Sequence, residues 1–174
     1  MKILEVRRHS IRSSGGDHLN QKGVALARKV GQDIGPFDFV ATSTMVRAYE
    51  TAIAMGFAVH EQKELMNTYG AVVEREAPWP MPYFHYSEIV KQDGAAARYA
   101  YQLVDYYTAI VDSLADGGSA LVINHGGVVE LGVVACLPNV DFLPWGDSVN
   151  YCEGARLFWD DGKFVTGEVL RVQS

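Results

Sequence analysis

The sequence predicts an α/β fold: a three-layer α/β/α sandwich with a mostly parallel central sheet and a C-terminal antiparallel hairpin. Short apolar runs of the kind found in buried strands alternate along the chain with amphipathic helical stretches. One run, Ser-Ala-Leu-Val-Ile-Asn at residues 119–124, has the composition of a strand buried on both faces. Near the C-terminus, two strand-like runs flank Asp-Asp-Gly-Lys at 160–163, which is typical of a hairpin turn.

The first half of the chain contains two predicted strand–helix pairs. Residues 3–6 form a short strand, followed by a polar Ser-Ser-Gly-Gly loop. Apolar residues at helical spacing then indicate a helix with Asn20 as its N-cap, ended by Gly35-Pro36. Residues 37–41 are expected to form a buried strand, and a second helix is expected over about 44–55.

The second half repeats the alternation after an aromatic interruption. Three prolines within five residues exclude a regular helix from residues 77–86, which we expect to be extended. This segment is interpreted either as a lid over a site or as a plug in the core. The elements predicted after it are a helix over 94–114, the strand at 119–124, a helix over 126–136 and hairpin strands at 155–159 and 164–172.

Length and composition limit the possible functions. The 174 residues, 48% of them apolar, suit one domain over 1–174 with an insertion at about 61–94. The net charge of −6 argues against binding nucleic acid or an anionic membrane through a broad basic face. Cys136 and Cys152 are in no metal-binding or signal-peptide context, so we expect reduced, buried thiols in a cytoplasmic protein.

Three polar groups of residues follow three predicted strands. Arg8-His9-Ser10 follows the first strand, residues 43–47 follow the second, and Asn124-His125-Gly126 follows the strand ending at Ile123. Ligands of open α/β sheets collect beyond the carboxyl ends of the strands. Two arginines and two histidines brought to one sheet edge therefore predict a phosphate site.

The same segments, in order, resemble motifs of the histidine phosphatase superfamily, which includes the cofactor-dependent phosphoglycerate mutases. Arg8-His9-Ser10 is similar to the family's Arg-His-Gly, and residues 19–23, Leu-Asn-Gln-Lys-Gly, resemble its Leu-Thr-x-x-Gly. Residues 43–52 resemble its Ser-x-Leu-x-Arg-Ala-x-Gln-Thr-Ala, and residues 123–127 its Val-Ser-His-Gly-Gly. The match extends over residues 1 to about 135.

This resemblance implies a role for each residue. His9 would be the nucleophile that forms a phosphohistidine, because a neutral imidazole nitrogen can attack phosphorus directly. Arg8, Arg47 and His125 would bind phosphoryl oxygens and stabilise the charge that develops during transfer. Further phosphate contacts are expected from the following residues: Ser10, Arg12, Ser43 and Gly126, the last as the start of a helix whose N-terminus favours an anion.

The sequence departs from the family at two places. Ser10 replaces glycine, so its side chain either is tolerated at the turn or presents its hydroxyl to the phosphate. Asn67 lies near the place of the mutases' glutamate, which leaves Glu74 as the preferred general acid and Glu64 as the alternative. The other large branch of the family has its general acid directly after the second histidine. This sequence has glycine at that position, residue 126, and so lacks that acid.

The prediction is a metal-independent phosphatase acting on a small phosphorylated substrate or a phosphorylated side chain. A phosphomutase of the same family and a non-catalytic phospholigand-binding module are the alternatives. No metal or cofactor is expected, because the histidines lack the spacing of zinc sites and adjacent arginines repel a cation. The sequence indicates no oligomeric state.

Overall fold

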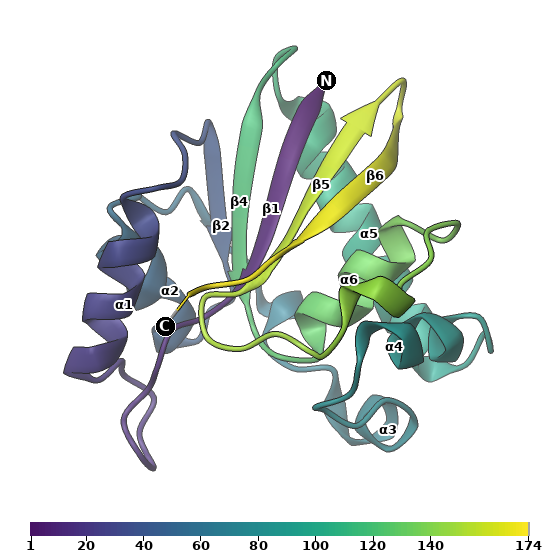
Figure 1. Cartoon of the computed structure of the whole chain (residues 1–174), viewed down its shortest axis with the longest axis horizontal. Coiled ribbons are helices and arrows are strands. Elements are labelled where there is room, and N and C mark those ends of the chain that lie inside the picture. The colour runs from purple at the N-terminus through teal and green to yellow at the C-terminus, as the bar shows by residue number, and fades with distance from the viewer. Residues whose placement is uncertain (174) are drawn as a thin grey trace.

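The computed structural model describes residues 1–173 and contains a six-stranded sheet with helices on both faces (Figure 1). The strand order is β3-β2-β4-β1-β5-β6. Strands β1, β2, β3 and β4 run parallel, whereas β5 pairs antiparallel with both β1 and β6. The predicted α/β sandwich with its C-terminal hairpin is therefore confirmed.

The strands and helices alternate as predicted, and most bounds differ by one to three residues. The strands are β1 Lys2–Arg8, β2 Phe39–Thr42, β3 Glu61–Gln62, β4 Ser119–Asn124, β5 Gly154–Asp160 and β6 Lys163–Leu170. The helices are α1 Gln21–Gly31, α2 Val46–Met55, α3 Gly70–Glu76, α4 Tyr83–Val90, α5 Ala95–Ser113 and α6 Val128–Cys136, with short 3-10 turns η1 Glu64–Met66 and η2 Leu143–Trp145.

Strand β4 separates two hydrophobic cores, because its side chains alternate between the faces of the sheet. Leu121 and Ile123 pack with residues of α1 and α2 on one face. Ala120 and Val122 join the larger core beneath α4, α5 and α6 on the other face. Figure 1 shows these two groups of helices on opposite sides of the sheet. A strand buried on both faces is what the apolar run at 119–124 predicted.

Helix α1 begins as predicted but ends earlier. The Asn20 side chain accepts the backbone N–H of Gly23 at 2.7 Å, which makes it the N-cap. The prediction that the helix continues to Gly35-Pro36 was wrong, because α1 ends at Gly31. A Cβ atom on Gly31 would lie 2.1 Å from the carbonyl oxygen of Met55, so this glycine permits the close crossing of α1 and α2.

The aromatic segment at 77–86 is only partly extended. Residues 77–82 form no regular element, but Pro82 caps helix α4, which begins at Tyr83. Proline is tolerated at a helix start because the first N–H groups have no partner within the helix. The side chains of Tyr83 and Tyr86 are fully buried in the larger core, whereas Trp79 remains partly exposed. The segment therefore combines core packing at its end with a partly exposed ring at its start.

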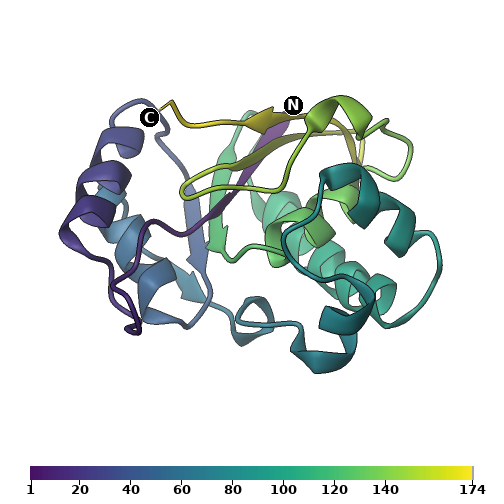
Figure 2. The same ribbon diagram turned by 60° about the horizontal axis from the view of Figure 1, so that its bottom comes forward.

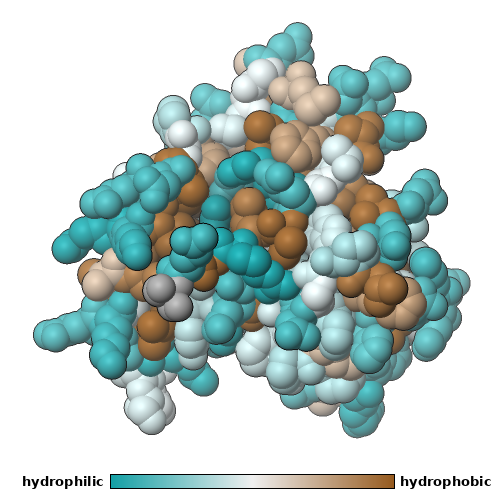
Figure 3. Space-filling model, viewed as in Figure 1, coloured by the Kyte–Doolittle hydropathy of each residue, from teal (hydrophilic) through white to brown (hydrophobic). Residues whose placement is uncertain are grey.

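The cysteines and the surface show further features of the chain. Both cysteines, Cys136 and Cys152, are free and buried, as predicted. On the face shown in Figure 3, hydrophobic residues reach the surface in separate patches between hydrophilic ones. Within residues 1–173, no helix combines the length and the apolar character that crossing a membrane requires.

Candidate active site

The parallel strands bring the three predicted groups of site residues to one edge of the sheet. β1 runs downward in Figure 1, and β2 and β4 run parallel to it, so their carboxyl ends lie at the bottom, the side that Figure 2 turns forward. His9, Ser43 and His125 each follow one of these strands directly. Backbone hydrogen bonds from His9 N to Asn124 O at 3.0 Å and from Ser43 N to Ile123 O at 3.0 Å continue the ladders to this edge.

His9 is buried and is held in one tautomer. Its Nδ1 lies 2.6 Å from the carbonyl oxygen of Ser10, and Arg47 Nε donates to its Nε2 at 3.3 Å. Both contacts require the proton on Nδ1 and the lone pair on Nε2. Burial, with smaller contributions from nearby arginines, lowers the pKa of His9 to about 3. His9 is therefore neutral near pH 7 and presents an unprotonated Nε2 beside Arg47.

His125 lies next to His9, with ring centroids 5.2 Å apart. Its Nε2 is 2.7 Å from the hydroxyl of Ser43, which also accepts the Met45 backbone N–H at 3.3 Å. The hydroxyl can donate to Nε2 or accept from it, so the neutral ring carries its proton on Nδ1 in the first case and on Nε2 in the second. Burial, followed by the charge effects of His9 and Arg47, lowers the pKa of His125 to about 2. His125 is therefore neutral near pH 7.

Two buried nitrogen atoms in this cluster are unpaired. Arg8 Nε and His125 Nδ1 have no hydrogen-bond partner within residues 1–173. A buried polar atom without a partner costs about 1–3 kcal/mol. An anion that accepts from Arg8 Nε, and from His125 Nδ1 when that atom carries a proton, would remove this cost and would also face Arg47.

Arg47 is paired with a residue that sequence reasoning missed. Asp17, in the loop after β1, forms an ion pair with Arg47 Nη1 and accepts the Val46 N–H at 3.3 Å. Asp17 therefore lies where the α2 N-terminus and Arg47 would attract a phosphate. The signal was an acidic residue in a Gly-Gly loop that directly follows the Arg-His motif.

The other predicted phosphate contacts divide into three cases. The Ser10 hydroxyl is fully buried and donates to Gly23 O at 2.7 Å, so it faces α1 and the prediction that it contacts phosphate is not supported. Ser43 acts on His125, as described above. Arg12 is exposed and bonds Gly16 O at 3.5 Å, yet it is close enough for its charge to lower the pKa of His9 and His125.

The predicted general acid Glu74 lies at the site, and Glu64 does not. Glu74, Arg47, His125 and Gly126 line one pocket of about 240 Å³. Glu64, in η1, is not among the residues that line it. Asn67, which stands near the place of the family's glutamate, lines the same pocket and binds the Thr44 backbone N–H through its side-chain oxygen at 2.8 Å.

Three further residues lie at the site: Trp79, from the 77–86 segment interpreted as a lid or a core plug, and Tyr151 and Glu130, which were not predicted. The guanidinium carbon of Arg8 lies 4.7 Å from the centre of the Trp79 ring and 4.2 Å from that of Tyr151. The indole N–H of Trp79 donates to Glu130 at 2.8 Å. No local motif marks these residues, since they come from separate segments and meet only in the folded chain.

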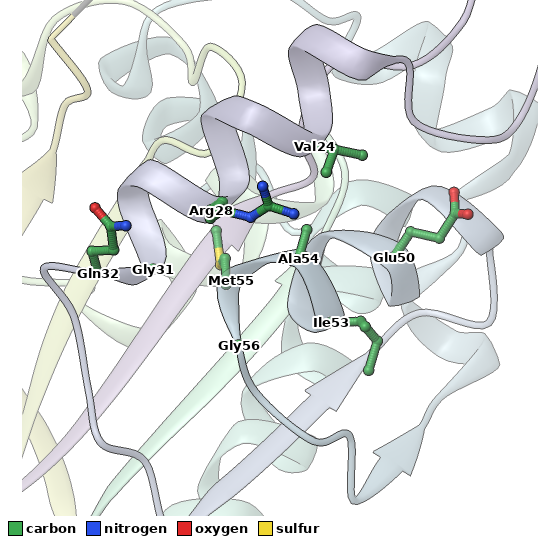
Figure 4. Close-up of a pocket in the computed structure, with 9 residues that line it drawn as sticks. All are labelled: Val24, Arg28, Gly31, Gln32, Glu50, Ile53, Ala54, Met55 and Gly56. Atoms are coloured by element: carbon green, nitrogen blue, oxygen red, sulfur yellow. The ribbon is translucent and has the colours of Figure 1, made fainter.

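A larger groove lies elsewhere on the molecule. It has a volume of about 590 Å³ and runs between α1 and α2, where Val24, Ile53 and Met55 form its apolar part (Figure 4). None of the predicted site residues lines it. Its size does not make it the catalytic centre, because it has no histidine and its residues present no nucleophile. The group around His9 is therefore the candidate active site.

Within residues 1–173, no cluster of side chains suited to a metal ion occurs.

Comparison with known proteins connects the chain to phosphatases and mutases through structure. No protein-family model and no curated protein matches the sequence. Among solved structures, a phosphoserine phosphatase from Entamoeba histolytica, solved in complex with 3-phosphoglyceric acid, aligns with a TM-score of 0.69 at 15% identity, over 99% of this chain and 98% of that one.

Two further structures agree with it. A mycobacterial glucosyl-3-phosphoglycerate phosphatase aligns with a TM-score of 0.67 at 17% identity, over 100% of both chains. A phosphoglycerate mutase from Bacillus anthracis aligns with a TM-score of 0.65 at 18% identity, over 97% of this chain and 92% of that one. The chain therefore has the same fold as these two phosphatases and this mutase.

Proposed function

We propose that the protein is a metal-independent phosphatase that hydrolyses a phosphomonoester through a phosphohistidine on His9. The observation that carries the proposal is the gathering around His9 of three side chains suited to phosphate. Arg47 Nε contacts His9 Nε2, the His125 ring lies beside the His9 ring, and the charge of Arg8 acts on His9, while Arg8 Nε and His125 Nδ1 are unpaired. Such an arrangement stabilises the charge on a phosphoryl group during transfer, which is the main task in phosphoryl-transfer catalysis.

The first step joins His9 to phosphorus. The lone pair of Nε2 attacks the phosphorus atom, the bond from phosphorus to the ester oxygen breaks, and the alcohol leaves with a proton from Glu74. The Nδ1–H bond to Ser10 O stabilises the positive charge that the ring gains on phosphorylation. Arg47 must release the Asp17 carboxylate and bind a phosphoryl oxygen in its place, so its guanidinium keeps an anionic partner.

The second step hydrolyses the phosphohistidine and regenerates free His9. Glu74, now a carboxylate, removes a proton from water, and the water oxygen attacks phosphorus. The bond between phosphorus and Nε2 then breaks, releasing inorganic phosphate and the neutral imidazole. The lowered pKa of His9 favours this release, because the ring is a good leaving group when its free form is stable.

A small phosphorylated molecule or a phosphorylated side chain is the proposed substrate class. The pocket of about 240 Å³ lined by Arg47 and His125 has the size for a phosphate with a small attached group. The phosphatases of similar fold act, by their names, on phosphoserine and on glucosyl-3-phosphoglycerate. A cytoplasmic location belongs to the same proposal and rests on the two free, buried cysteines. The absence of nucleic acid or a membrane as partner agrees with the net charge of −6.

Hydrolysis of an aryl phosphate in the presence of EDTA tests the proposal. An aryl leaving group needs little help from the general acid, so the assay depends on His9 and its arginines alone. We expect turnover that resists EDTA and disappears in His9→Ala. His85→Ala is a matched control, since His85 lies on α4 outside the cluster. Turnover that survives His9→Ala would exclude the phosphohistidine mechanism, and phosphate binding without any turnover would favour a binding module.

A further inference from the structure

Trp79 packs directly on the backbone that carries His125. A Cβ atom on Gly126 would lie 2.4 Å from the Trp79 ring, so the indole occupies the space that a side chain at residue 126 would fill. Trp79 comes from the irregular segment between α3 and α4, whereas Gly126 follows β4. The ring is only partly buried, which sets it apart from the fully buried Tyr83 and Tyr86 of the same segment.

The same indole contacts Arg8. The guanidinium carbon lies over the Trp79 ring at 4.7 Å and over the Tyr151 ring at 4.2 Å. A planar guanidinium stacks well on aromatic rings, and such contacts are stronger where water is excluded. Arg8 is largely buried, and desolvation lowers its pKa from the usual value. Because Nε has no partner within residues 1–173, the rings are prominent among the contacts that orient this side chain.

Glu130 fixes the indole in turn. Its carboxylate accepts the Trp79 N–H at 2.8 Å and the Gly127 backbone N–H at 3.0 Å, and the side chain is fully buried. Glu130 lies in the first turn of α6, which begins two residues after Gly126. One buried acid thus ties the ring over Arg8 to the turn that follows His125.

We propose that Trp79, held by Glu130, is a positioning residue that sets the guanidinium of Arg8 to receive phosphate. The inference rests on the proposed role of Arg8 as a phosphate ligand. A guanidinium already stacked between neighbours loses less side-chain freedom on binding than a free one. Trp79 touches the arginine, and phosphate affinity therefore depends on both the ring and the bond that fixes its orientation.

Two substitutions separate the ring from its hydrogen bond. Trp79→Leu removes the aromatic face and the N–H, and we expect it to weaken the binding of inorganic phosphate by about tenfold, measured by titration calorimetry. Trp79→Phe keeps an aromatic face but cannot bond Glu130, so its affinity is expected between those of Trp79→Leu and the wild type. Glu130→Gln, which weakens the same bond from the other side, is expected to resemble Trp79→Phe.

Trp159→Leu is the matched control. Trp159 is a buried tryptophan of β5 that packs on Phe164 rather than on a site residue. Its loss is expected to lower the thermal transition at least as much as Trp79→Leu while leaving phosphate affinity unchanged. This control distinguishes a positioning role from a general loss of stability.

The outcomes separate this inference from the proposed function. Equal phosphate affinity in wild type and Trp79→Leu would overturn the inference and leave the phosphatase proposal in place. Weaker binding in Trp79→Leu by a protein that hydrolyses no phosphate ester would support the inference and refute the phosphatase. Absence of phosphate binding by the wild type at millimolar concentration would overturn both.

Discussion

The ionisation of the two site histidines follows from where they are buried. Desolvation disfavours their charged forms, and the neighbouring arginines add to this effect, so the pKa of His9 falls to about 3 and that of His125 to about 2. His18 behaves in the opposite way, because its exposed ring bonds Glu50 at 3.0 Å, which raises its pKa. Burial thus keeps the two site histidines neutral near pH 7, whereas the pair with Glu50 shifts the pKa of His18 in the opposite direction.

This difference predicts distinct histidine titrations. In the phosphate-free protein, the ring signals of His9 and His125 are expected to stay constant from about pH 5 to 8, because both rings are neutral throughout that range. The His18 signal is expected to titrate with a midpoint above its usual value, since the pair with Glu50 favours the charged form. NMR spectra of the imidazole carbons measure all three. A midpoint near 6.5 for His9 would contradict the desolvated environment.

If Arg47 binds phosphate as proposed, Asp17 competes with phosphate for its guanidinium. Asp17→Asn removes the carboxylate that occupies Nη1, so inorganic phosphate is expected to bind up to about fivefold more tightly, as befits a partly exposed ion pair. Asp116→Asn changes the net charge equally at an exposed position outside the site and serves as the control. Calorimetric titration with phosphate gives the comparison. Weaker binding in Asp17→Asn would mean that Asp17 orients Arg47 instead of competing with phosphate.

Glu74 is expected to matter most when the leaving group is poor. General acid catalysis contributes about 100-fold or more, so Glu74→Gln should lower kcat for an alkyl phosphate by roughly that factor. An aryl phosphate leaves without this help, and its kcat should change only severalfold. Glu64→Gln, an exposed neighbour outside the pocket, should change neither rate. Equal losses on both substrates would exclude Glu74 as the acid.

The packing of α1 against α2 depends on a position without a side chain. Gly31 crosses the backbone of Met55 so closely that a Cβ atom would lie 2.1 Å from its carbonyl oxygen. Helix α2 carries Arg47 in its first turn, and α1 accepts the Ser10 hydroxyl at Gly23 O. The crossing of these helices therefore helps to set two of the loops that form the site.

Gly31→Ala is expected to destabilise the protein by about 1–3 kcal/mol, because backbone atoms must move to admit the methyl group. Lys29→Ala changes an exposed residue of the same helix and is expected to be nearly neutral. Denaturant unfolding of both variants measures the effect. A Gly31→Ala variant as stable as the wild type would show that the two helices separate without cost.

The sequence predicts a helix or strand correctly where a local hydrophobic pattern specifies it. It predicts the end of an element correctly where a nearby side chain caps that end. The run at 119–124 and the Asn20 cap were located correctly because burial on both faces and a side-chain cap leave direct marks in the sequence. The end of α1 was placed too late because the crossing at Gly31 depends on a distant helix. The start of α4 at Tyr83 was missed because proline disrupts the interior of a helix but is tolerated at its start, where Pro82 lies.

The sheet topology assembles the site from segments far apart in the sequence. Parallel β1, β2 and β4 end at one edge, which brings the two motif histidines and Arg47 together as the order of the motifs predicted. The same argument could not find Trp79 or Asp17. Trp79 contacts Arg8 only because the irregular segment after α3 folds back onto the site. Asp17 contacts Arg47 from a loop, and no sequence periodicity predicts the conformation of a loop.

If His9 accepts the phosphoryl group, the phosphorylated protein can be trapped before water attacks the phosphorus atom. The protein is mixed with an aryl phosphate, quenched rapidly under alkaline conditions that preserve phosphohistidine, digested and analysed by mass spectrometry. We expect one added phosphoryl group on the peptide containing His9, lost on acid treatment and absent from His9→Ala. Turnover with no phosphorylated His9 peptide, or with the phosphoryl group on another residue, would exclude His9 as the nucleophile.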